Sequence, residues 1–159
     1  MRRIISLVIA LTVFLSLTMP ASATTMDIEN YFILSASNSR ITNDGNFTIN
    51  CYSNVRSDHN FIATSYSIPL TISAQVYNQE PGVEPRNAEN VYYTLYLYKV
   101  GITDPIGQYT HAANGETGST SFTVSTGSEY YFTIVISGRL GAWEYVYGNG
   151  DISNIYLVQ

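Results

Sequence analysis

The chain has 159 residues, and only 12% of them are charged, giving a formal net charge of −5 at pH 7. Seven basic residues against twelve acidic ones argue against binding to nucleic acid and to anionic membrane surfaces. A single cysteine excludes an internal disulfide, and a secreted chain without disulfides favours a bacterial source. The low fraction of charged residues is typical of extracellular β-domains.

The first 23 residues match a secretory signal peptide. Residues 1–3 form a basic start, and residues 4–19 form an apolar stretch shorter than the roughly 20 residues that a spanning helix requires. Ala21-Ser22-Ala23 is a small-residue cleavage site. We therefore expect cleavage after Ala23 and a single secreted domain over residues 24–159, with no transmembrane segment in the mature chain.

Residues 31–55 are predicted to form a β-hairpin around the turn signal at residues 43–45. A three-residue loop with Gly45 in the left-handed region pairs Ile41 with Phe47 and Ile33 with Val55. This register gathers the apolar side chains on one face: Ile33, Ile41, Phe47, Ile49, Cys51 and Val55. Cys51 is then a buried structural residue and not a nucleophile.

The rest of the chain alternates apolar and polar residues, which predicts an antiparallel all-β fold. The segment 68–76 is the clearest strand, with Pro69 near its start. Residues 114–118 and the Gly148-Asn149-Gly150 stretch are expected to be loops. The later strands are expected at 91–100, 106–110, 119–124, 130–137, 143–147 and 152–158.

The segment from Phe122 to Ile136 resembles the corner between strands E and F of fibronectin type III and immunoglobulin-like domains. There, Gly127 precedes Tyr130, and alternating apolar residues follow. The resemblance covers residues 66–158 and implies a β-sandwich, to which the N-terminal hairpin is an addition. It also implies that the Tyr130 hydroxyl bonds back to the backbone across the corner.

No catalytic motif is present in the sequence. His59 and His111 are the two histidines, and both lie in polar stretches. On a strand, the neighbours Asp58 and His59 would point to opposite faces and would not pair. No cofactor is implied. Calcium is the most plausible metal, and its candidate ligands in predicted loops are Asp104, Asn114, Glu116, Asn149 and Asp151.

Tyrosine is the one outlier in composition, with 14 in the chain. Two clusters are candidate ligand-binding surfaces, because tyrosine offers a stiff, amphipathic contact area. The first is a ladder on the outer face of one strand: Tyr92, Tyr96 and Tyr98. The second shares one side of another strand: Trp143, Tyr145 and Tyr147. Tyrosine also favours strands for structural reasons, so both readings stay open.

These observations predict a secreted, non-enzymatic binding module that meets a protein or glycan at the cell exterior through an aromatic-rich face. One alternative is a self-assembling structural, surface or matrix protein, for which a homo-oligomer is expected. A second alternative is a small secreted hydrolase or an antimicrobial toxin.

Overall fold

The computed structural model describes residues 30–36, 45–80 and 82–158, so the predicted signal peptide and the predicted turn at residues 43–44 lie outside the described residues. The fold is all-β, as expected, and every strand pairing is antiparallel. None of the described residues forms a helix long and apolar enough to cross a membrane. The strands are β1 (Tyr31–Ala36), β2 (Gly45–Cys51), β3 (Asn54–Arg56), β4 (Phe61–Ala63), β5 (Ser67–Asn78), β6 (Ala88–Lys99), β7 (Gly107–Thr123), β8 (Glu129–Gly138), β9 (Glu144–Ile152) and β10 (Ile155–Leu157).

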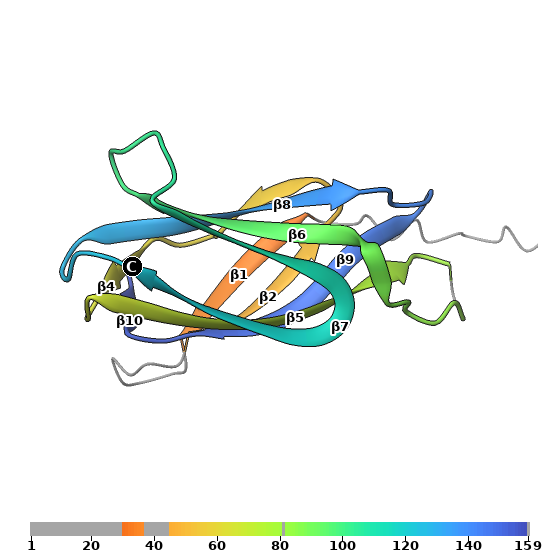
Figure 1. The fold of residues 1–159 in the computed structure, drawn as a ribbon, viewed down its shortest axis with the longest axis horizontal. Coiled ribbons are helices and arrows are strands. Elements are labelled where there is room, and N and C mark those ends of the chain that lie inside the picture. Colours follow the sequence, from red (N-terminus) through yellow and green to blue (C-terminus); the bar gives the residue numbers. More distant parts are fainter. Residues whose placement is uncertain (1–29, 37–44, 81, 159) are drawn as a thin grey trace, which may run out of the picture.

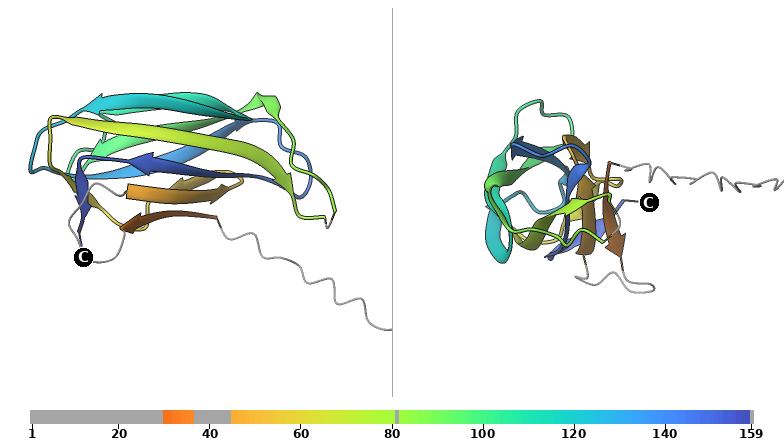
Figure 2. Two further views of the ribbon diagram at one scale, coloured as in Figure 1. Left: turned by 90° about the horizontal axis from the view of Figure 1, so that it is seen from below. Right: turned by 90° about the vertical axis from the view of Figure 1, so that its right-hand side faces the viewer.

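The strands form one strongly curled, half-barrel sheet in the order β1-β2-β9-β5-β7-β6-β8-β4-β10, with β3 paired to β8 (Figures 1 and 2). The long strand β7 connects its two halves. Residues 107–113 pair with β6, and residues 114–123 pair with β5. Gly115, just after this change of partner, has a φ of 80°, a conformation that glycine adopts without steric cost. Figure 1 shows β7 curving from the β6 side of the molecule to the β5 side.

The core lies inside this curl and follows the period-two pattern of the sequence. In β5 the buried residues are Ile68, Leu70, Ile72, Ala74 and Val76, and in β6 Val91, Tyr93, Leu95 and Leu97 are all fully buried. Phe132 of β8 sits where the two halves meet. Its ring lies 5.3 Å from Phe61, 5.7 Å from Phe122 and 6.3 Å from Phe32, measured between centroids.

The register predicted for the first hairpin is wrong. β1 pairs Leu34 with Phe47 and Phe32 with Ile49, so Phe32 and Leu34 enter the core while Ile33 is 40% exposed. Ile41 lies outside the described residues. The buried alternation of β2 fits either register locally. The observed register places Phe32 in the core, where its ring contacts Phe47 and Phe132.

Gly45 also has another role than the predicted one. It is not a left-handed loop residue but the first residue of β2, paired with Ala36 on one side and Ile152 on the other. A Cβ at this position would clash with the carbonyl oxygen and side chain of Ile152. The glycine is required for close strand approach and not for a positive φ.

Two predicted loops are parts of strands. Residues 114–118 belong to β7, and residues 148–150 belong to β9. Glycine weakens a strand, which is why the sequence indicated turns at both places. In the structure, Gly148 and Gly150 point inward, where Ala74 and Phe47 occupy the space that side chains would take.

The Tyr130 hydroxyl bridges back to the corner that precedes β8. It accepts a hydrogen bond from the Ser125 backbone N at 2.8 Å and donates one to the Ser125 carbonyl oxygen at 3.2 Å. Its ring is 1% exposed and stacks on Phe61 at 6.2 Å. The corner is therefore tied to the core by one side chain.

Replacing Tyr130 by phenylalanine is expected to lower the free energy of unfolding by about 0.5–1.5 kcal/mol, because the part-buried hydrogen bonds between its hydroxyl and the Ser125 backbone are lost. Denaturant unfolding followed by tryptophan fluorescence measures this loss. Tyr131→Phe is the matched control, because Tyr131 is partly exposed and its hydroxyl makes no hydrogen bond with another described residue. Equal stabilities for the two variants would contradict a structural role for the corner.

Candidate binding face

The outer face of the β1-β2-β9-β5 layer carries both aromatic and polar side chains. At one end, Tyr77 of β5 stacks on Tyr145 of β9 at 5.9 Å and meets Tyr147 edge-on at 5.5 Å. Tyr77 and Tyr145 are direct cross-strand partners. The pKa of Tyr145 is raised, chiefly by burial and further by the nearby hydroxyls of Tyr77, Tyr31 and Tyr147. These four residues are named the tyrosine cluster below.

Polar residues continue the face from the tyrosine cluster in register. Tyr147 has Asn50 and Gln75 as its neighbours across the strands. The next row consists of Thr48, Asn149 and Ser73, and the one after it of Asn46, Asp151 and Thr71. Asp151 follows Tyr145 by six positions, so the rows extend over about 20 Å at the usual rise of a strand.

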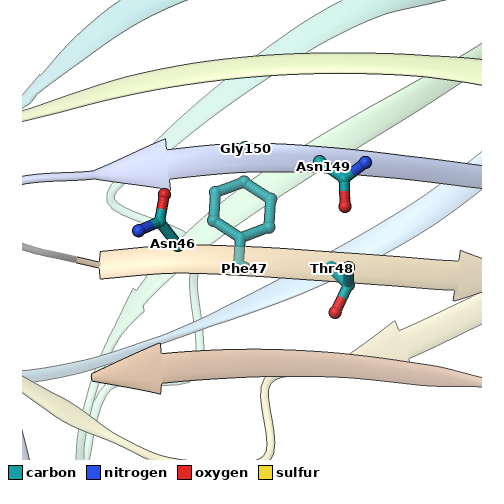
Figure 3. Close-up of a pocket in the computed structure, with 5 residues that line it drawn as sticks. All are labelled: Asn46, Phe47, Thr48, Asn149 and Gly150. Carbon is teal, nitrogen blue, oxygen red and sulfur yellow. The ribbon is translucent and has the colours of Figure 1, made fainter. Parts of the chain in front are cut away.

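Two shallow depressions lie in these polar rows. One, of about 200 Å³, lies between β2 and β9 and is lined by Asn46, Phe47, Thr48, Asn149 and Gly150 (Figure 3). The other, of about 240 Å³, shares three of these residues and extends over β5. Gly150 has no side chain, and the Phe47 ring packs directly against it from the core. The floor of the first depression is therefore apolar and its rim consists of amides and a hydroxyl.

Most of the polar side chains at the depressions have no hydrogen-bond partner among the described residues. Among the described residues, no hydrogen bond is made by the side chains of Asn46, Thr48, Thr71, Thr117, Asn149 or Asp151. Asn50 Oδ1, beside Tyr147, is buried and also has no partner within the described part of the chain. Buried polar atoms normally have a partner, so this face holds unused hydrogen-bonding capacity.

Trp143 does not belong to the row predicted for it. It lies in the turn before β9 with a φ of 66° and is 61% exposed, whereas Tyr145 and Tyr147 face outward from the strand itself. Glu144 holds this turn. It accepts two hydrogen bonds from the Arg86 guanidinium, at 2.8 and 2.7 Å, and one from the Gly141 backbone N. The Arg86 hydrogen bonds are the main reason that the pKa of Glu144 is lowered.

The ladder predicted on β6, which consists of Tyr92, Tyr96 and Tyr98, faces outward, but the surroundings of the three side chains differ. Tyr98 stacks almost parallel on Tyr131 of β8, with centroids 5.1 Å apart, and the Arg56 guanidinium lies 3.8 Å above the Tyr131 ring. Tyr92 is 42% exposed, and Tyr96 is half-buried between Gln108 and Thr133. The ring face of Tyr98 is used within the sheet, which fits the structural reading of that residue.

The residues weighed for catalysis are not assembled into a site. Asp58 and His59 lie in a bend and not on a strand, so, against expectation, their side chains do meet, with Nδ1 and Oδ2 3.0 Å apart. His111 lies elsewhere, beside Tyr93 and Tyr109. Cys51 is fully buried, and loss of solvation raises the pKa of its thiol to about 11, so it is not a thiolate at neutral pH.

The calcium candidates are dispersed among the described residues. Asn114 and Glu116 bond to each other, Asn149 and Asp151 lie on the outer face, and Asp104 lies in the turn after β6. Within residues 30–36, 45–80 and 82–158, no three side chains of His, Cys, Asp or Glu form a group that could hold a metal ion.

Sequence reasoning missed Tyr77 and the contribution of β2. Tyr77 continues the outward alternation of Thr71, Ser73 and Gln75 by one step, but the predicted strand stops at Val76, two residues before the end of β5. That pattern was a usable signal. Asn46 and Thr48 gave no such signal, because only the pairing of β2 with β9 brings them beside Asn149.

No protein-family model matches the sequence, and no curated protein matches it. The solved structures that resemble the fold distantly include two binding proteins. Aeromonas hydrophila PliG, a periplasmic lysozyme inhibitor of g-type lysozyme, is 9% identical with a TM-score of 0.40, covering 78% of this chain and 96% of that one. TmCBM61 in complex with β-1,4-galactotriose is 15% identical with a TM-score of 0.32, covering 74% of this chain and 66% of that one. Both TM-scores are below 0.5, so these likenesses carry no argument about function.

Proposed function

We propose that this protein is a secreted, non-enzymatic binding module whose working surface is the outer face of the β1-β2-β9-β5 layer. One observation carries the proposal. Rings of the tyrosine cluster lie beside six polar side chains that make no hydrogen bond within the described chain. Aromatic contact area next to unused donors and acceptors is the composition of a recognition surface. The signal peptide predicted for residues 1–23 supports action at the cell exterior.

The assembling alternative needs a free strand edge, and the edge of β1 is partly occupied. The Asp58 backbone N donates to the Phe32 carbonyl oxygen at 3.0 Å, and the Leu34 backbone N donates to the Asp58 carboxylate at 2.9 Å. At the other end of the order, β10 has three residues. Both features oppose edge-to-edge growth, and they favour binding over self-assembly.

An immunoglobulin-like relationship for residues 66–158 belongs to the same proposal. It is supported by the pairing of β5 with the second half of β7, by the pairing of β6 with β8, and by the Tyr130 corner. These correspond to the B–E and C–F pairs and to the tyrosine corner of that fold. The first half of β7 takes the place of strand C′, and the hairpin β1–β2 is an addition.

The test is binding of the immobilised secreted chain to a panel of purified extracellular proteins and polysaccharides. We expect at least one member to bind, and the double variant Tyr145→Ser/Tyr147→Ser to weaken that binding at least about tenfold. Interferometry gives the affinities, and unfolding midpoints show that the variants are folded.

The matched control is Tyr92→Ser/Tyr96→Ser, which removes two outward tyrosines from β6, on the opposite side of the curl. This control is expected to bind like the unaltered protein. A panel with no bound member, or a larger loss in the control than at Tyr145 and Tyr147, would contradict the proposal.

A further inference from the structure

We infer that the ligand of this face is an uncharged oligosaccharide chain, lying along β9 from the tyrosine cluster to Asp151. The inference rests on the proposed function and adds the chemical class of the ligand and its path. Three independent features of the face support it: its charge, its hydrogen-bonding groups and the position of its rings.

The charge of the face disfavours an anionic ligand. The residues that line the two depressions include no lysine or arginine, and Asp151 is the one charged residue among them. The whole chain is acidic as well, with a formal net charge of −5. A phosphate, sulfate or uronic acid at this place would meet a carboxylate and no cation, so a neutral ligand is favoured.

The hydrogen-bonding groups of this face are suited to a ligand that is rich in hydroxyls. Asn46 and Asn149 face each other diagonally across β2 and β9, and each amide offers two donors and one acceptor oxygen. Thr48, Thr71 and Thr117 add hydroxyls that both donate and accept, and the Asp151 carboxylate accepts. Sugar hydroxyls also both donate and accept, so each of these groups finds a complement whichever way it is oriented.

The shape of the face distinguishes a glycan from a folded protein partner. Both depressions are shallow and have polar rims, so neither offers a deep apolar pocket for a protein's anchoring side chain. The tyrosine cluster stands at one end of the polar rows, and its Tyr145 and Tyr147 lie on β9, the strand that also carries Asn149 and Asp151. A chain of sugar rings could pack its C–H faces against Tyr145 and Tyr147 while its hydroxyls reach Asn149 and Asp151, over a path of about 20 Å.

The test is electrophoresis of the native protein through gels that contain soluble polysaccharides. Neutral glucans, mannans, xylans and galactans form one set, and polygalacturonate and alginate form the other. We expect retardation by at least one neutral polymer and none by the acidic polymers at the same concentration. The variant Asn46→Ala/Asn149→Ala is expected to weaken the interaction at least about tenfold.

Gln108→Ala/Ser137→Ala is the matched control, because it removes two exposed polar side chains from the outer side of β7 and β8. It is expected to be retarded like the unaltered protein. Retardation by the acidic polymers alone, or retardation that survives the loss of Asn46 and Asn149, would overturn the inference. Binding to a panel protein through Tyr145 and Tyr147 without retardation by any neutral polymer would overturn it too, while leaving the proposed binding function intact.

Discussion

Replacing Phe132 by alanine is expected to lower the free energy of unfolding by about 3–5 kcal/mol, the usual cost of emptying a phenylalanine site in a core. Phe132 is fully buried and its ring contacts come from β1, β4 and β7, which belong to both halves of the curled sheet. The cavity would therefore lie where the two halves meet and could not close by moving one strand. Chemical denaturation followed by circular dichroism measures the loss.

Thr133→Ala is the control for this prediction, because Thr133 is the next residue of β8 and points to the opposite face. Its effect is expected to stay within about 0.5 kcal/mol, as for most surface substitutions. A domain of this size is stabilised by only about 5–15 kcal/mol, so Phe132→Ala leaves a marginal fold. A loss below about 1 kcal/mol at Phe132 would show that the two halves do not share one core.

Replacing Gly148 by valine is expected to cost about 3 kcal/mol or more, which is at the upper end for overpacking. A Cβ at Gly148 would lie 2.6 Å from Ala74 Cβ and 2.9 Å from Ala74 Cα, and closer still to the Ser73 carbonyl oxygen. Two of these contacts are backbone atoms, which cannot rotate away as a flexible side chain can. The unfolding midpoint of the purified variant measures the cost.

Asn149→Val places the same side chain one residue further along β9, on the exposed outer face. Because valine favours strands, its effect on stability is expected to stay within about 1 kcal/mol. The contrast would also separate stability from recognition, since Asn149→Val is expected to keep the fold and to lose the neutral polysaccharide. Similar unfolding midpoints for the two valine variants would mean that residues 148–150 form a loop, as their glycines first suggested.

The two tyrosine groups illustrate what sequence can and cannot assign. Both were found from composition and period-two spacing, and the outward direction of Tyr92, Tyr96, Tyr145 and Tyr147 follows from that spacing. Their surroundings do not follow from it. Tyr98 stacks on Tyr131, over whose ring Arg56 also lies, whereas Tyr145 stacks on Tyr77, and these partners lie on strands distant in the sequence.

Local pattern by itself determined which residues of β2, β5 and β6 enter the core, although it gave the wrong face for β1. Alternation in β5 and β6 is visible in the sequence because one face of each strand is apolar, and the burial of Cys51 follows from the same rule in β2. Composition and the missing motifs likewise argued against nucleic-acid binding before any fold was considered. The conclusions about burial depend only on neighbours within a few residues along the chain, and the one about nucleic acid depends only on composition and motifs.

Only the tertiary structure decided the pairing. The first hairpin differs from its expected register because Phe32 and Leu34 pack in a core to which the distant Phe132 contributes. β7 continues through a glycine-rich stretch because each half finds a different partner strand. The candidate face has the same origin: Asn149 comes beside Thr48, and Tyr77 beside Tyr145, through long-range strand pairing. The period-two pattern predicts which face of a strand a side chain occupies. Strand order and register depend on packing between distant segments, and a local pattern does not predict them.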